Sequence, residues 1–235
     1  MLTDITFAPT VGPYHDSASA LFSEHYNLPN LSAKYGKNST SADYWYVYNN
    51  TLFMHLNNSD SSANTNGEHV KFMREAIAAN PDVKWKITVM HYSLYSTAKH
   101  AQEFGTKYID ALAPAFTELG IDLVLSGHDH VYVRTKVMNG KEISDDVISD
   151  GKVSDPSGTV YICANTSTGV RFYEKVLTDT EFVAFESYEK RKSAIKFEVT
   201  DTSITMTTYF LDDMSVMDTF IIEKTTAESM ILPAA

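Results

Sequence analysis

The chain has 235 residues, of which 43% are hydrophobic and 12% aromatic, so it can bury a sizeable core in one large domain or two small ones. Its formal net charge of −11 argues against nucleic acid as the main partner, because phosphate backbones are bound by an excess of lysine and arginine. A single cysteine, Cys163, excludes an intrachain disulfide and a cysteine-based zinc site. The sequence shows neither a membrane helix nor the pattern of a signal peptide.

The first part of the chain predicts a helix and a hairpin. Residues 17–26 place apolar side chains at helical spacing. The runs 43–48 and 51–56 are aromatic and β-branched, and Asn49-Asn50 separates them, which is typical of a tight β-hairpin. A polar loop follows, and then a helix is expected over residues 68–79.

The middle of the chain predicts a parallel β-α-β unit. Residues 83–90 form an apolar run that ends at His91, and residues 121–126 form a second one. Between them lies a helical stretch near 107–119, closed by Gly120. Strand, helix and strand in this order favour two parallel strands in a buried sheet.

Beyond Gly140 the chain becomes richer in strands. A polar stretch at 139–158 precedes five β-rich runs, which predict an antiparallel arrangement. The expected fold class is therefore α/β (α+β), with a parallel β-α-β centre and an antiparallel C-terminal part. We expect one domain over 1–235, with an α/β portion at 1–138 and a β-rich portion at 139–235.

Three histidines follow the two predicted parallel strands. His91 ends the first, and His128 and His130 follow the second after Gly127. Ligands bind beyond the carboxyl ends of strands in open α/β sheets, so the three imidazoles are expected to converge. We expect Gly127 to let the backbone turn, His128 and His130 to point to one side, and Asp129 to point away.

Two interpretations of these histidines stay open on residue type alone. Each could cap its strand by hydrogen bonding, which is the ordinary role of a single histidine at such a position. Neutral imidazole is also a common ligand of Zn, Fe and Mn, and three histidines at neighbouring strand ends favour a metal site. A plain β-rich structural domain would leave all three unexplained.

Two segments resemble a known family. "VMHYSLYS" (89–96) and "LVLSGHDHVYVRT" (123–135) are similar to the last two metal-binding blocks of the calcineurin-like metallophosphoesterases, in the bacterial branch that resembles purple acid phosphatases. Residues 22–30, 158–174 and 216–224 also look like the corresponding segments of that branch. The resemblance implies a partial metallophosphoesterase β-sandwich flanked by helices, and hydrolysis of phosphomonoesters by a metal-bound hydroxide.

The resemblance also implies roles for single residues. His91 and His128 match ligands of one metal, and His130 matches a ligand of the other. His100 stands where related proteins place a histidine against the substrate phosphate, although an ordinary loop histidine explains it equally well. His15 matches a histidine that helps to protonate the leaving group. Iron, zinc or manganese are the metals implied, and the residues Tyr132 and Arg134 are expected to support the loop.

The sequence departs from the family pattern at its start. "PTVGPYHD" (9–16) has Pro13-Tyr14 in place of the metal-binding asparagine, and only eleven residues precede Gly12, so the first two blocks with their bridging carboxylates are absent. Asp122 and Asp129 are the nearest carboxylates in sequence, and neither is expected to replace them. We therefore expect at most one bound metal and weak activity. The alternative is a non-catalytic truncated remnant or binding module.

The same departure predicts partners and location. Without the first blocks, an apolar face should lie uncovered beside "ITVM" (87–90) and "LVLS" (123–126), and a homodimer could cover it. A phosphorylated small molecule or other phosphoester is the expected substrate. Relatives are mostly exported, so the resemblance implies an extracytoplasmic parent protein.

Overall fold

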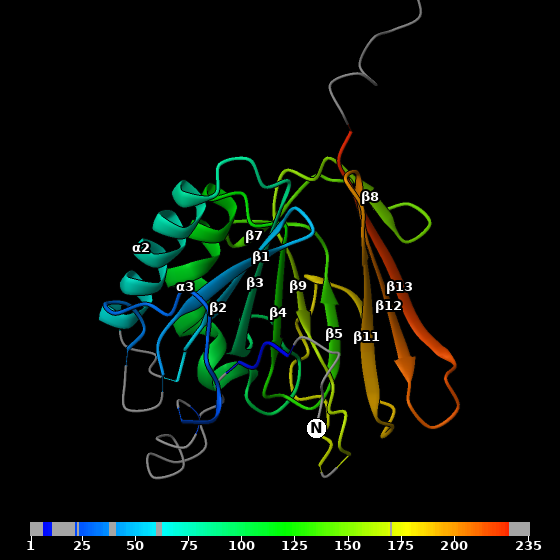
Figure 1. Cartoon of the computed structure of the whole chain (residues 1–235). Helices are drawn as coiled ribbons and strands as arrows, with labels where there is room; N and C mark the ends of the chain where they lie inside the picture. Colours follow the sequence, from blue (N-terminus) through cyan, green and yellow to red (C-terminus); the bar gives the residue numbers. More distant parts are fainter. Residues whose placement is uncertain are drawn as a thin grey trace, which may run out of the picture.

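The computed structural model describes residues 7–10, 22, 24–37, 41–59, 63–169 and 171–225, apart from the side chains of residues 63 and 102–106. The described chain forms three layers: two helices, a central seven-stranded mixed sheet and a four-stranded sheet (Figure 1). The central sheet has the spatial order β1 (Tyr44–Tyr48), β2 (Thr51–Leu56), β3 (Trp85–Tyr92), β4 (Leu123–Gly127), β9 (Val160–Cys163), β5 (Tyr132–Thr135) and β10 (Val183–Ser187). This mixed α/β fold confirms the predicted fold class.

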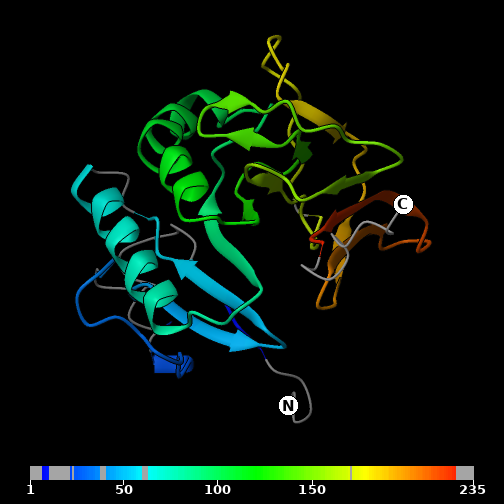
Figure 2. The same ribbon diagram turned by 90° about the horizontal axis from the view of Figure 1, so that it is seen from above.

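The remaining elements flank this sheet. The helices α2 (Ala63–Ala79) and α3 (Ala101–Glu118) cover one face, and the second sheet covers part of the other (Figure 2). In spatial order the second sheet consists of β11 (Ser193–Val199), β12 (Ser203–Phe210), β13 (Val216–Glu223) and β8 (Lys152–Ser154). The short strands β6 (Met138–Asn139) and β7 (Glu142–Ile143) pair with each other.

The predicted hairpin and β-α-β unit are both present. β1 and β2 pair antiparallel, and Asn49 and Asn50 between them have φ of 46° and 58°, the left-handed conformation that a tight hairpin turn requires. β3 and β4 pair parallel, with α3 between them in the chain. The carboxyl ends of β2, β3 and β4 therefore lie at one edge of the sheet.

The C-terminal part is not antiparallel throughout, as the sequence had suggested. β11, β12 and β13 do form an antiparallel meander, but β9 inserts into the central sheet parallel to β4, and β8 runs parallel to β13. All four residues of β9 are buried, as expected for an inner strand with both faces covered. Pairing partners distant in sequence thus decide the direction of β9.

Two of the helices differ from their predicted bounds. α2 begins at Ala63 rather than near residue 68, and α3 begins at Ala101 rather than near residue 107. Both early turns are rich in polar residues, which hide the apolar spacing used for the prediction. Most of the helix expected over 17–26 lies outside the described residues.

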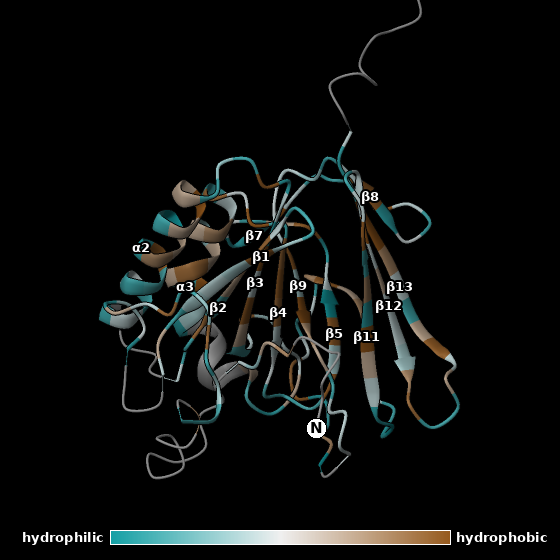
Figure 3. Ribbon diagram, viewed as in Figure 1, coloured by the Kyte–Doolittle hydropathy of each residue, from teal (hydrophilic) through white to brown (hydrophobic). Residues whose placement is uncertain are grey.

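Hydrophobic residues are frequent along the strands of both sheets and on the helices (Figure 3), and the buried ones pack into clusters. One cluster fills the space between the helices and the central sheet and includes Met54, Tyr108 and Phe116. A second lies between the two sheets and includes Trp85 and Phe220. Among the described residues, no helix is long and apolar enough to cross a membrane.

The uncovered apolar surface lies elsewhere than predicted. Ile87, Met90, Leu123 and Val124 are all buried, so the strands β3 and β4 are covered on both faces. Among the described residues, the second sheet covers the middle of the central sheet and leaves the outer side of the β1–β2 hairpin open. Tyr48 there is 70% exposed.

Candidate functional site

His91 and His128 meet at the carboxyl ends of β3 and β4. The Nε2 atom of His91 lies 3.0 Å from Nδ1 of His128, and the ring centroids are 5.0 Å apart. His91 is the second-last residue of β3, and His128 follows Gly127 at the end of β4. The parallel pairing of the two strands therefore brings these imidazoles together.

The end of β3 is fixed by Asn58, a fully buried residue that follows β2. Its Oδ1 accepts hydrogen bonds from the backbone N–H of His91 at 3.0 Å and of Tyr92 at 3.3 Å, and its Nδ2 donates to the carbonyl oxygen of Tyr92 at 3.2 Å. Tyr108 of α3 donates to the backbone carbonyl of Asn58 at 2.7 Å. The irregular end of β3 is thus held from two sides.

His130 lies close enough to the pair to contribute to lowering the pKa of both His91 and His128. His128 has φ of 70°, so the left-handed turn lies at His128 itself rather than at Gly127. This turn breaks the extended alternation on which the prediction relied. The His130 ring stacks on Tyr173 with centroids 5.1 Å apart, and its Nδ1 donates to the carbonyl oxygen of Arg171 at 2.7 Å.

His100 does lie beside the pair. It immediately precedes α3, and its ring centroid is 4.5 Å from that of His128 and 5.4 Å from that of Tyr173. The carboxylate of Asp129 accepts hydrogen bonds from the Ser96 hydroxyl and from the backbone N–H of His100. The loop before α3 and the loop after β4 therefore pack against each other.

Burial keeps both paired imidazoles neutral at pH 7. It lowers the pKa of His91 to about 4, with a further contribution from the nearby His130. Burial also lowers the pKa of His128 to about 3, and the neighbouring His91 and His100 add to the effect. Neutral imidazole is the form that binds metal ions, so the pair is in the ligand state without further deprotonation.

The described residues fit part of a metal site. The imidazole pair supplies two suitable donors, but no group of three or more His, Cys, Asp or Glu side chains within the described ranges could hold a metal ion. His15 lies outside the described residues. Asp122 lies at the opposite end of β4, as its sequence position implied. Its carboxylate pairs with Lys224 at 2.7 Å.

Tyr132 and Arg134 have structural partners. Both donate to Asp218 of β13, Tyr132 from its hydroxyl at 2.9 Å and Arg134 from Nε at 2.7 Å. The Arg134 guanidinium also lies over the Phe220 ring, 4.2 Å from its centroid. These contacts join the strand after the histidine loop to the second sheet.

The sequence reasoning missed Asn58 and Tyr173. Asn58 could have been found, because it follows a buried strand at the same sheet edge as His91 and His128, where polar side chains gather. Tyr173 offers no such signal. It lies between β9 and β10 and reaches His100 and His130 only through the tertiary fold.

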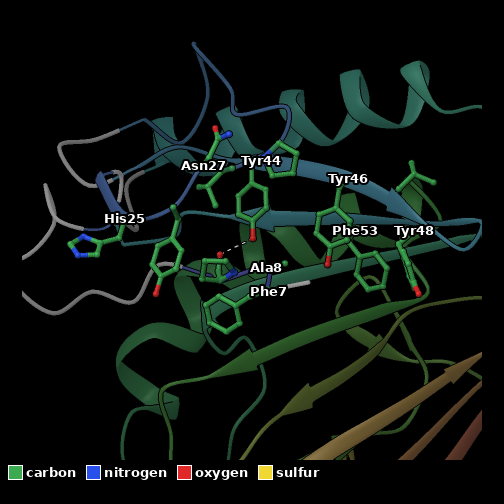
Figure 4. Close-up of a pocket in the computed structure, with 13 residues that line it drawn as sticks. Phe7, Ala8, His25, Asn27, Tyr44, Tyr46, Tyr48 and Phe53 are labelled. Carbon is green, nitrogen blue, oxygen red and sulfur yellow. Dashed lines mark hydrogen bonds between the residues drawn. The ribbon is translucent and has the colours of Figure 1, made fainter. Parts of the chain in front are cut away.

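A large cavity lies apart from the histidines. It has a volume of about 840 Å³ and opens over the outer side of β1 and β2 (Figure 4). Tyr44, Tyr46, Tyr48 and Phe53 line it in a row, and the Tyr44 hydroxyl donates to the carbonyl oxygen of Pro9 at 2.7 Å. None of its lining residues is formally charged.

Comparison with known proteins places the chain in a family. The family model of the calcineurin-like phosphoesterases matches residues 12–132, which is 121 of the 235 residues. The chain belongs to this family. Purple acid phosphatase 18 of Arabidopsis thaliana is a calcineurin-like relative that is 34% identical over 79 residues, covering 33% of this chain and 15% of the relative.

Solved structures share the calcineurin-like phosphoesterase fold. The purple acid phosphatase PPD1 of yellow lupin (Lupinus luteus) has a TM-score of 0.65 and 19% identity, over 83% of this chain and 35% of its own. GAP50, the anchor in the inner membrane complex of Plasmodium, has a TM-score of 0.56 and 12% identity, over 81% and 60%. PhoD has a TM-score of 0.53 and 9% identity, over 88% and 46%. The chain therefore spans less than two thirds of each of these relatives.

Proposed function

We propose that this chain carries part of a metal-dependent phosphoesterase site, centred on His91 and His128. The observation that carries the proposal is the 3.0 Å approach of their ring nitrogens at the ends of two parallel strands. Family membership supports phosphoester chemistry, and the neutral state of both rings supports metal binding. Iron, zinc or manganese suits imidazole donors.

In this proposal each histidine has one task. His91 and His128 hold the metal, and His130 holds a second ion when a complete ligand set is present. His100 approaches the substrate phosphate from the start of α3, and His15 serves the leaving group. A bound metal ion would activate water and polarise the phosphoryl oxygens. Tyr92, whose ring centroid lies 4.5 Å from that of His128, shields one side of the pair.

We further propose that the chain alone binds at most one metal ion and hydrolyses phosphomonoesters weakly. The described residues offer the imidazole pair but no neighbouring carboxylate to offset the charge of two close cations. The alternative is a non-catalytic remnant or binding module. The fold is similar to that of GAP50, which is an anchor, and this similarity supports testing for a binding module as well as for an enzyme.

Metal analysis and an aryl phosphate assay test the proposal together. Untagged protein should bind at most one zinc, manganese or iron ion per chain, and His128→Ala should lower the affinity about tenfold or more, because one of two close donors is lost. Exposed His25 offers a matched control, and His25→Ala should leave metal affinity unchanged. Metal binding without turnover supports the binding module. Robust turnover that survives His128→Ala contradicts the proposed site.

We also propose that two copies of the chain associate through the open side of the β1–β2 hairpin. Exposed aromatic residues gather there, Phe7 at 61% and Tyr48 at 70%, and large apolar patches seldom stay solvated on a monomer. The cavity lining lacks formal charge, so two copies of a chain with net charge −11 can approach there without local repulsion. For the parent protein we propose an extracytoplasmic location, supported by the family resemblance and testable by cell fractionation.

A further inference from the structure

Asp129 lies between His128 and His130 in sequence, yet its carboxylate serves a different part of the fold. The residue is only 2% exposed. Its Oδ2 accepts a hydrogen bond from the Ser96 hydroxyl at 2.7 Å, and its two oxygens lie 3.0 and 3.2 Å from the backbone nitrogen of His100. Within the described part of the chain, no Lys or Arg forms an ion pair with it.

The start of α3 explains how a carboxylate can be buried there. His100 occupies the N-cap position and makes no side-chain capping bond. The positive end of the helix dipole favours a negative charge at this place, and hydrogen bonds to an ionised acceptor are the stronger kind. Asp129 therefore holds the residue that begins the helix from a neighbouring strand end.

The backbone of Asp129 is itself fixed. The buried Cys163 thiol donates to the carbonyl oxygen of Asp129 at 3.3 Å and approaches that of Gly127 at 3.5 Å. Val131 N–H also donates to the Asp129 carbonyl, at 2.8 Å. Since the strand end is rigid, the carboxylate can act as a fixed point for the loop that contains Ser96 and His100.

We propose that Asp129 is a positioning residue for His100, holding its imidazole beside the His91–His128 pair by fastening the start of α3 to the histidine loop. The His100 and His128 ring centroids lie 4.5 Å apart. The role of His100 toward phosphate rests on the proposed phosphoesterase function. The positioning of His100 by Asp129 is independent of that function.

The first test needs neither metal nor substrate. In Asp129→Asn the shape is kept, but the charge is lost and an amide N–H₂ faces donor groups. We expect the His100 backbone amide to exchange with deuterium about tenfold faster or more, and the nuclear Overhauser contacts between the His100 and His128 rings to weaken. Contacts between His91 and His128 should persist. Unchanged exchange and unchanged contacts overturn the proposal.

Ser96→Ala is the milder second variant. It removes one donor from the carboxylate and leaves the charge and the His100 bond in place, so the effect on exchange should be smaller than that of Asp129→Asn. If Asp129→Asn does not fold, Ser96→Ala still decides. An effect confined to residue 96, with no change at His100, contradicts the proposal.

The second test links the positioning to phosphate. Zinc-loaded wild-type protein, Asp129→Asn, His100→Ala and the double variant would be titrated with inorganic phosphate. If Asp129 acts through His100, both single variants lose about tenfold in affinity and the double variant loses no more than His100→Ala. Additive losses contradict the proposal. Wild-type protein that binds no phosphate contradicts the proposed function instead. The hydrogen-exchange experiment then tests the positioning role of Asp129 by itself.

Discussion

At the end of β2, the Asn58 side chain makes three hydrogen bonds to the backbone of β3 at His91 and Tyr92. The preceding turn is fixed in the same way, because Asp43 Oδ1 accepts the N–H of Asn57 at 2.8 Å and Asp43 Oδ2 lies 2.7 Å from Nδ1 of the buried His69. A chain of buried polar groups thus sets where His91 stands. Buried polar groups are costly when they lose a partner, so single changes here have large effects.

Asn58→Ala should lower the free energy of unfolding by about 3 kcal/mol, because two buried N–H groups and one carbonyl lose their partner. It should also weaken metal binding, since His91 is no longer held. Urea unfolding and metal titration measure the two effects. Asn30→Gly is a control at an exposed position with φ of 48°, where a single bond to the carbonyl of Trp45 is lost and glycine tolerates the left-handed conformation, so it should cost less than about 1 kcal/mol. Equal losses in both variants contradict this account.

His55 predicts an acid dependence of stability. Burial lowers its pKa to about 3, its ring stacks on Tyr44, and its Nδ1 lies 2.6 Å from the Thr10 hydroxyl. An unfolded chain protonates this ring below about pH 6.5, so it binds more protons than the folded chain from there down to pH 3. Stability contributed by neutral His55 is therefore present above pH 6.5 and is lost as the pH falls.

The test compares wild-type protein with His55→Phe, which keeps the ring stacking and removes the titration. Between about pH 7.5 and about pH 5.0, wild-type protein should lose about 2 kcal/mol more unfolding free energy than the variant. Urea unfolding at the two pH values measures the difference. Parallel losses would show that His55 is not the buried neutral group described.

At the scale of elements, the sequence predicted secondary structure correctly where the residues that determine an element are adjacent in the chain. Asn49-Asn50 between two aromatic runs predicted the hairpin, since both residues tolerate the left-handed conformation found there. The parallel direction of β9 was not predictable, because it depends on β4, which is distant in sequence. The exact position of the turn after β4 was also not predictable from residue type. The left-handed conformation falls on His128 and not on the adjacent Gly127. Histidine in a sequence does not indicate such a conformation.

The hairpin turn offers a matched pair of variants. Asn50 has φ of 58° and its Oδ1 accepts from the N–H of Lys84 at 3.3 Å. Asn50→Gly and Asn50→Ala both lose this bond, but only alanine is strained by the left-handed conformation. Asn50→Ala should therefore be less stable than Asn50→Gly by about 1 kcal/mol. Thermal or urea unfolding measures the difference, and a more stable alanine variant would contradict the turn geometry.

At the scale of the whole molecule, the second sheet covers β3, β4 and β9 and leaves the hairpin side of the central sheet open (Figure 2). The loop before β1 covers part of the free edge of β1, since the Asn30 amide donates to the carbonyl oxygen of Trp45 at 3.0 Å. Pairing of strand edges is therefore a weaker route to association than packing of the aromatic faces. This distinction decides which variant tests the proposed dimer.

Light scattering on the purified chain should show a dimer at micromolar concentration, and a stable interface of this kind typically buries about 1,200–2,000 Å². Tyr48→Lys places a charge at the turn end of the aromatic face and should shift the equilibrium to monomer by about tenfold or more, because burying an unpaired cation is costly. Met214→Lys introduces the same charge at another exposed apolar residue, in the turn between β12 and β13, and should leave the dimer unchanged. A wild-type monomer of 26.3 kDa at these concentrations contradicts the dimer. Equal sensitivity to both lysine variants would show that net charge, rather than the aromatic face, controls association.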